Sequence, residues 1–113
     1  MLFRNEEHQK FYEAAAERIG RNGEKLALVY LIGLNDCTRE NWRACYDIEH
    51  DNIHLDCLQD GWQTGGSLRA MKLGFALYMW TDIDVVDIFC AHDLYPYFIE
   101  AMNIRFGHKM VFE

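Results

Sequence analysis

The sequence has little of what marks chains outside the ordinary globular class. One proline and eight glycines in 113 residues exclude collagen-like and low-complexity structure. No apolar run reaches about 18 residues, so we expect no membrane-spanning helix. The segment from Met1 to Glu7 lacks the basic and apolar regions of a signal peptide. We therefore expect a soluble, cytoplasmic domain.

Cysteine pairs with metal or redox spacing are also missing. The four cysteines are Cys37, Cys45, Cys57 and Cys90, and no C-x-x-C motif is present. In a cytoplasmic chain such residues are typically reduced and buried. We expect free thiols and no disulfide framework.

The chain nevertheless contains enough apolar material for one core. Half of its residues are hydrophobic and 14% are aromatic, which excludes a disordered chain. Area scaling gives burial of roughly two thirds of the unfolded surface. We predict a single domain over residues 1–113 that needs no metal or disulfide.

Helical spacing and capping residues predict an all-α fold, a compact bundle of five or six helices. Asn5 is expected to cap the first helix, which stops at Gly20 and Gly23. The apolar segment 24–34 is assigned as a helix because it is long for a strand and no second β-rich segment pairs with it. Further helices are expected from Asp36 or Thr38 to Asp47, Ser67 to Trp80, Val85 to Cys90 and Asp93 to Gly107, with a short turn at 55–59 and a loose tail from His108.

The helix that Ser67 opens is apolar on two sides. A helix with two apolar faces packs against neighbours on both of them. We therefore expect it to lie at the centre of the bundle.

The net charge of −7 is unevenly distributed. Two stretches without Lys or Arg, between Arg43 and Arg69 and between Lys72 and Arg105, hold ten of the 18 acidic residues. Nucleic acids and anionic membranes need basic side chains, so direct binding of either is disfavoured. A basic protein surface is allowed, since acidic patches steer such partners. The alternative is that the acids only keep a small protein soluble.

Aromatic and acidic residues in the second stretch form a candidate partner-binding surface. Exposed aromatics among carboxylates are typical of protein interfaces, although the same aromatics can belong to the core. The acids at 82–87 lack the glycine and glutamate of a calcium loop. The alternative to a functional role is that they form a solvated turn and cap helices. The candidate residues are Asp82, Asp84, Asp87, Asp93, Tyr95 and Tyr97.

A glycine-containing loop gives an alternative candidate site. Glycines before a helix let backbone amides face an anion, and the helix dipole adds positive potential. The glycines are adjacent and no lysine precedes the serine, so this is not a Walker loop. A plain loop that ends in a serine cap stays the competing interpretation. The candidate ligand-binding residues are Trp62, Thr64, Gly65, Gly66, Ser67 and Arg69.

Metal binding and catalysis find little support. His50 and His54 would share a helical face, but Asp51 disfavours a helix there, and the spacing to Cys57, Cys90 and His92 matches no standard zinc pattern. No G-x-S-x-G elbow is present, and the cysteines have no active-site context. We expect no metal, no cofactor and no enzymatic activity.

Three segments carry a resemblance to a known family. They include FRNEEH at 3–8, GWQT at 61–64 and PYF at 96–98. With them the chain resembles a family of small proteins of unknown function from Gram-positive gut bacteria, associated with phages and conjugative elements. The family has no assigned activity, so the resemblance implies only a mobile-element accessory protein.

This context and the charge distribution lead to a hypothesis. Small acidic proteins on mobile elements often inhibit host defence without catalysis, as anti-CRISPR proteins do. We expect carboxylates at 47–60 and 82–100 to pair with Lys and Arg on a defence nuclease. The alternative is a module that binds a phosphorylated or nucleotide compound at Gly65 to Ser67. Phage assembly and transcription roles stay open, as does the oligomeric state.

Overall fold

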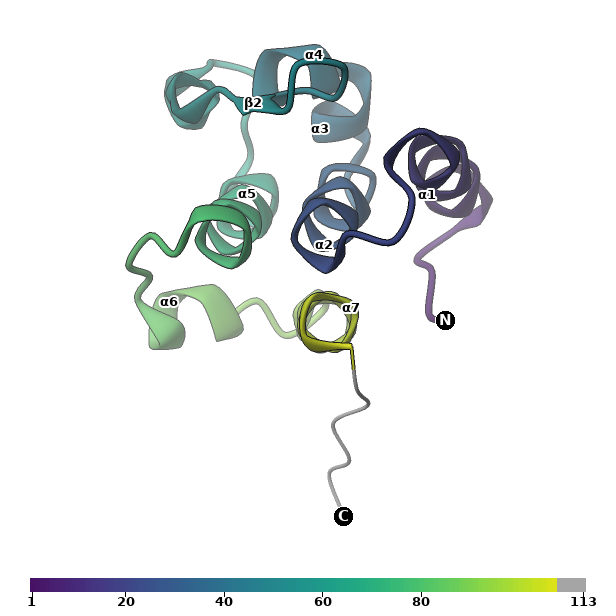
Figure 1. Cartoon of the computed structure of the whole chain (residues 1–113). Helices are drawn as coiled ribbons and strands as arrows, with labels where there is room; N and C mark the ends of the chain where they lie inside the picture. Colours follow the sequence, from purple (N-terminus) through teal and green to yellow (C-terminus); the bar gives the residue numbers. More distant parts are fainter. Residues whose placement is uncertain (108–113) are drawn as a thin grey trace.

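One apolar helix, α2 (Gly23–Ile32), lies at the centre of the structure. The computed structural model describes residues 1–107, and six consecutive side chains from Ala27 to Ile32 are at most 1% exposed. Figure 1 shows α1, α5 and α7 packed around this helix. A helix that is apolar on all sides is stable only when neighbours cover it. The helix prediction for 24–34 is confirmed. The helix that begins near Ser67, expected at the centre, is α5: it contacts α2, α6, α7 and η1, but α2 is the more completely buried of the two.

The other elements surround α2 in a mainly helical arrangement. Residues 1–107 form seven α-helices, one 3-10 helix and one two-stranded antiparallel sheet, in which Tyr46 lies opposite Ile53. The all-α prediction is confirmed. The bounds are α1 (Glu6–Ile19), α3 (Asp36–Glu40), α4 (Trp42–Cys45), β1 (Tyr46–Asp47), β2 (Asn52–Ile53), η1 (Leu55–Gln59), α5 (Gly65–Met79), α6 (Val85–Phe89) and α7 (Tyr95–Phe106).

Local signals set several of these helix ends. The Asn5 side chain accepts a hydrogen bond from the His8 amide, and α1 ends at Gly20, whose φ of +82° favours glycine. Asn22 caps α2 in the same way, so Gly23 begins that helix and does not stop the one before it. The short turn expected at 55–59 is present as η1.

The expected third helix is broken into α3 and α4. Asn41 leaves helical geometry, with φ −111° and ψ 27°, and its side-chain amide donates to the Cys37 carbonyl at 2.8 Å. After Cys45 the chain becomes extended because Tyr46 pairs with Ile53. The bundle therefore has more and shorter helices than expected.

Three further boundaries differ from the prediction. The cap of α5 is Thr64 and not Ser67, because the Thr64 hydroxyl accepts from the Ser67 amide in a capping box. The same helix ends at Met79, and Trp80 is its left-handed C-cap. Asp93 does not cap α7, which starts after Leu94 without a side-chain cap and has Pro96 in its first turn. The tail expected from His108 lies outside the described residues.

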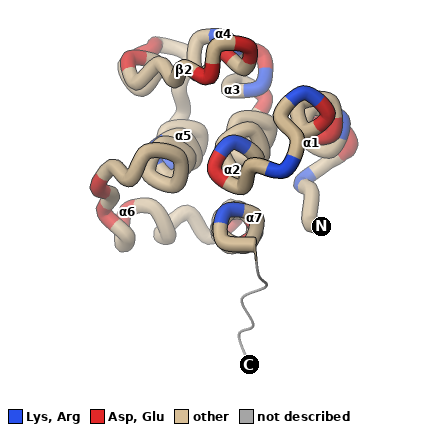
Figure 2. The backbone as a smooth tube through the Cα atoms, in the orientation of Figure 1, with Lys and Arg blue, Asp and Glu red and all other residues tan. Residues whose placement is uncertain are grey.

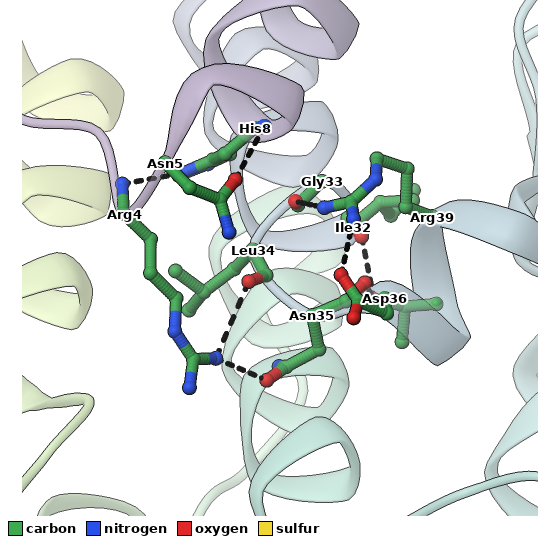
Figure 3. Close-up of polar contacts among 10 residues, drawn as sticks. Arg4, Asn5, His8, Ile32, Gly33, Leu34, Asn35, Asp36 and Arg39 are labelled. Atoms are coloured by element: carbon green, nitrogen blue, oxygen red, sulfur yellow. Dashed lines mark hydrogen bonds and ion pairs between the residues drawn. The ribbon is translucent and has the colours of Figure 1, made fainter.

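The C-terminal end of α2 is buried and held by side chains from other segments. The last carbonyls of a helix have no partner within it, and buried ones need hydrogen bonds from elsewhere. Figure 3 shows Arg4 and Arg39 reaching this end of the helix. The four carbonyls that accept are those of Tyr30, Ile32, Gly33 and Leu34, and their donors are, in order, His8, Thr38, Arg39 and Arg4.

His8 is the buried titratable member of this set. Its side chain is fully buried, and its two ring nitrogens contact the Arg4 amide at 3.1 Å and the Tyr30 carbonyl at 2.8 Å. The amide can only donate and the carbonyl can only accept, so Nδ1 is the acceptor and Nε2 carries the proton. Burial lowers the pKa of His8 to about 4, and the Arg39 and Arg4 guanidinium groups act in the same direction. The ring is therefore neutral at physiological pH.

The N-terminal end of α2 approaches α7 closely. A Cβ atom on Gly23 would lie 2.8 Å from the Arg105 carbonyl oxygen and 3.0 Å from that of Ile104. Arg105 also donates from Nε to the Leu77 carbonyl of α5 at 2.7 Å. The ends of α2, α5 and α7 are thus joined at this point by backbone proximity and one shared arginine.

Candidate functional site

Apolar side chains are concentrated on the surface where α5 passes into α6. We call Met79, Trp80, Val85 and Val86 the 79–86 patch. Trp80 is 80% exposed and Val86 is 81% exposed, although both are large or branched apolar residues. Four exposed apolar side chains within eight residues of one connection make this surface a candidate interaction site.

Trp80 has an unfavourable backbone as well as an exposed side chain. Its φ of +67° lies in the left-handed region, where its amide donates to the Ala76 carbonyl at 2.8 Å. Glycine is the usual residue at such a helix end, and another residue costs roughly 1–2 kcal/mol there. Folding gains little from this side chain, so its position points to a role outside the fold.

A groove lies beside the patch, between η1 and α6. It has a volume of about 390 Å³, and its fully buried floor is formed by Phe75 of α5 and Ile88 of α6. We call it the η1–α6 groove. Leu55, Leu58 and Ile83 form its sides. It therefore offers an apolar interior that is open to solvent.

The predicted acid triplet lies at this groove, and the structure separates the roles of its members. Asp82, Asp84 and Asp87 all line the groove, together with Lys72. Asp84 accepts from the Val86 and Asp87 amides as the cap of α6, and Asp87 pairs with Arg69 at 3.4 Å. The Asp82 carboxylate makes no hydrogen bond or ion pair within residues 1–107. Figure 2 shows the acidic residues along the α5–α6 connection. Among the described residues, Asp82 is thus free of contacts, Asp84 caps a helix and Asp87 is paired.

The remaining candidate partner residues lie elsewhere. Asp93 and Tyr95 are exposed near the start of α7 and do not line the groove. Tyr97 is half-buried, and its ring centroid lies 6.4 Å from that of His8. The structure thus brings together the acids at 82–87, leaves Asp93 and Tyr95 on the surface, and places Tyr97 against the core.

The first acidic stretch is largely engaged in internal contacts. Asp47 pairs with His50 at 2.7 Å, and Glu49 pairs with Arg18 at 3.0 Å. Asp51, with φ +51°, accepts from the hydroxyls of Tyr46 and Tyr78 and pairs with Lys25. These carboxylates hold the β1–β2 turn in place, so the stretch is not a continuous acidic surface.

The contacts of Asp51 shift its own pKa and that of Tyr78. Desolvation opposes the charged form of Asp51, but the hydrogen bonds from Tyr78 and Tyr46 outweigh it and hold the pKa of that carboxyl below its usual value. Burial, together with the bond to Asp51, raises the pKa of Tyr78 to about 12. The carboxylate therefore stays ionised as the acceptor at neutral pH.

The polar side chains of the alternative anion loop bond mainly within the protein. Thr64 and Ser67 bond to each other in the capping box, and the Ser67 hydroxyl also contacts Gln63. Arg69 donates to the Asp87 carbonyl at 2.9 Å besides pairing with its carboxylate. Gly65 and Gly66 form the first turn of α5, and Trp62 packs against the core. This geometry serves the helix start and engages both hydroxyls and two of the three guanidinium nitrogens within the protein.

The histidines and cysteines considered as metal ligands lie apart. Within residues 1–107, no group of three or more His, Cys, Asp or Glu side chains is arranged to hold a metal ion. All four cysteines are free; Cys45 and Cys57 are buried, Cys37 is half-buried and Cys90 is exposed.

Sequence reasoning missed the 79–86 patch. It assigned Trp80 to the apolar face of a helix, because the heptad-like spacing continues through position 80. The usable signal was the pair Val85 and Val86 after a capping aspartate, since a helix of five residues turns adjacent side chains to different sides. Both valines are exposed here, whereas the adjacent apolar residues of the enclosed α2 are buried.

Comparisons with known proteins complete the description. A family model described as a family of unknown function, DUF6075, matches residues 1–113. No curated protein and no solved structure matches the chain. The resemblance to a family of unknown function is thereby confirmed over the whole chain. Across the described helices, none is long and apolar enough to span a membrane.

Proposed function

We propose that this chain, which belongs to the family of unknown function DUF6075, is a non-enzymatic protein-binding module. The observation that supports this proposal most is the 79–86 patch, in which Trp80 and Val86 are about four-fifths exposed. Aromatic and aliphatic anchors at the centre of an interface supply most of its binding energy, and charged groups at the rim guide the partner. Asp82 and Asp84 beside the patch make a basic partner surface the favourable one.

The finer proposal concerns the partner and the setting. We propose that the partner is the Lys- and Arg-rich surface of a host defence nuclease, in the manner of anti-CRISPR proteins. The chain would be an accessory protein of a phage or conjugative element in a Gram-positive gut bacterium and would act in the host cytoplasm. The supports are the net charge of −7 and the absence of Lys and Arg between Lys72 and Arg105.

Complex formation with purified basic defence nucleases tests this function. We expect Val86→Asp to weaken the complex at least tenfold, because it places a charge in the apolar centre. Asp82→Asn removes the free carboxylate without touching a cap, and we expect a loss of about three- to fivefold and a weaker dependence on salt. Size-exclusion chromatography, titration calorimetry and cleavage assays are the measurements.

A matched control uses the exposed Glu13 of α1, which makes no hydrogen bond or ion pair with any described residue. Glu13→Gln changes the net charge as much as Asp82→Asn does, and we expect it to bind like the native chain. Equal binding by Val86→Asp, Asp82→Asn and the control would count against the proposal. So would the lack of any complex with every nuclease tested.

Trp80 gives an independent prediction, because its two effects have opposite signs. Trp80→Gly relieves the left-handed backbone, so we expect the unfolding free energy to rise by about 1 kcal/mol. The same change removes the largest exposed apolar side chain, so we expect partner binding to fall at least tenfold. Thermal melts and the binding assay measure the two quantities on one variant. A destabilised variant that still binds would contradict both parts.

A further inference from the structure

The η1–α6 groove and its acidic edge together describe one kind of partner segment. We propose that the groove takes a single large apolar side chain, leucine or phenylalanine, from a partner segment that carries arginine close by on either side. This inference rests on the proposed protein-binding function and specifies which chemistry of the partner is recognised.

The size and the floor of the groove fit one anchor side chain. Its volume of about 390 Å³ lies at the small end of ligand pockets, so it has room for one large side chain and part of the backbone that carries it, but not for a folded element. Phe75 and Ile88 at the floor are each 1% exposed and belong to the main core, so the floor is fixed in place. Apolar side chains gain the most free energy where such a preformed surface removes them from water.

The edge of the groove determines which residues flank the anchor. Asp82 has no partner among residues 1–107, and Asp84 bonds only to backbone amides, so neither carboxylate is paired with a cation there. Asp87 is partly neutralised by Arg69. Lys72 also lines the groove, so three carboxylates face two cations and the edge has a net charge of about −1. Guanidinium groups bind carboxylates through two parallel hydrogen bonds, which favours arginine over lysine.

Leu55 offers a way to close the groove without disturbing the core. Its side chain is 45% exposed and lines the groove from η1. Leu55→Trp is expected to fill the opening, while Phe75 and Ile88 stay untouched. Val86 does not line the groove, so Val86→Asp serves as the variant that damages only the neighbouring patch.

Methyl NMR titration of the full chain with short synthetic peptides tests the inference. The probe is a nine-residue peptide of glycine and serine with a central phenylalanine and an arginine two residues away on each side. We expect shifts in the methyl groups of Leu58, Ile83 and Ile88, and no shift for Leu31 in the core. Replacing the peptide's phenylalanine by serine is expected to weaken binding at least tenfold, and replacing its arginines by glutamate at least as much.

The variants separate this inference from the proposed function. If the inference holds, Leu55→Trp loses the peptide-induced shifts, whereas Val86→Asp and Glu13→Gln keep them. No shifts at millimolar peptide, or shifts that persist in Leu55→Trp or with the glutamate peptide, would overturn the groove assignment. In that event a nuclease complex weakened by Val86→Asp would still support the protein-binding function. If the peptide binds the groove as expected but no variant weakens the nuclease complex, the broader function is overturned instead.

Discussion

Between pH 6.5 and pH 4 the protein is expected to lose about 3 kcal/mol of unfolding free energy through His8 alone. The ordinary pKa of a histidine is 6.5, and burial lowers the pKa of His8 to about 4 in the folded protein. In this interval the unfolded chain binds the proton and the folded one does not, so acid favours unfolding. The stabilisation is complete above pH 6.5 and is lost as the pH falls toward 4. Urea unfolding at half-unit steps of pH measures the loss.

His8→Gln is the variant that isolates this effect. Its amide does not titrate, and it keeps a donor that can bond to the Tyr30 carbonyl. We expect the stability of this variant to be nearly flat from pH 6.5 to pH 5. His50→Gln is the matched control, because His50 is exposed and pairs only with Asp47. If His8→Gln loses stability with acid as steeply as the native chain, the buried ring is not the cause.

Gly23→Ala is expected to destabilise the fold by about 1–2 kcal/mol, although alanine is the better helix former. Alanine is better than glycine in a helix by up to about 1 kcal/mol. The new Cβ atom, however, would lie 2.8 Å from the Arg105 carbonyl oxygen, which belongs to the backbone of α7 and cannot rotate away. Overpacking of this kind costs typically 1–3 kcal/mol, and it outweighs the propensity gain.

Gly65→Ala is a close control for that change. Gly65 is also the first residue of its helix, but a Cβ there meets only the Arg69 side chain, at 3.3 Å. A flexible side chain can move, so we expect a change of at most about 0.5 kcal/mol. Chemical denaturation of both variants gives the comparison. Equal effects at the two positions would show that proximity of α2 and α7 does not set the stability here.

The sequence predicted the elements that depend on neighbouring residues. Asn5 caps the start of α1 and Gly20 caps its end, and both were predictable because capping contacts lie within one helical turn. Segment 24–34 was assigned correctly by its length and by the lack of a strand partner. The β1–β2 turn was missed because its partners are distant: Asp51 bonds to Tyr78 of α5 and pairs with Lys25 of α2. Periodicity carries no information on such contacts.

The candidate site was predicted only in part, because some of its features depend on residues that are distant in the sequence. The acids at 82, 84 and 87 do line one groove, since they lie within one short connection. Whether each carboxylate is free depends on Arg69, eighteen positions before Asp87, and on the two amides that Asp84 caps. The exposure of Trp80 depends on where α5 ends, and a shift of one residue turns that side chain from the bundle to solvent. Boundaries of this kind are the least predictable feature of a helix.

The enclosed position of α2 has a consequence for how the protein is made. The ribosome releases this apolar helix before two of the helices that cover it, α5 and α7. Until α7 has left the exit tunnel, the nascent chain presents Leu28 to Ile32 to water and to chaperones. Folding of this domain is therefore expected to wait until α7 is available, and a chain cut short before α7 should be degraded rather than accumulate.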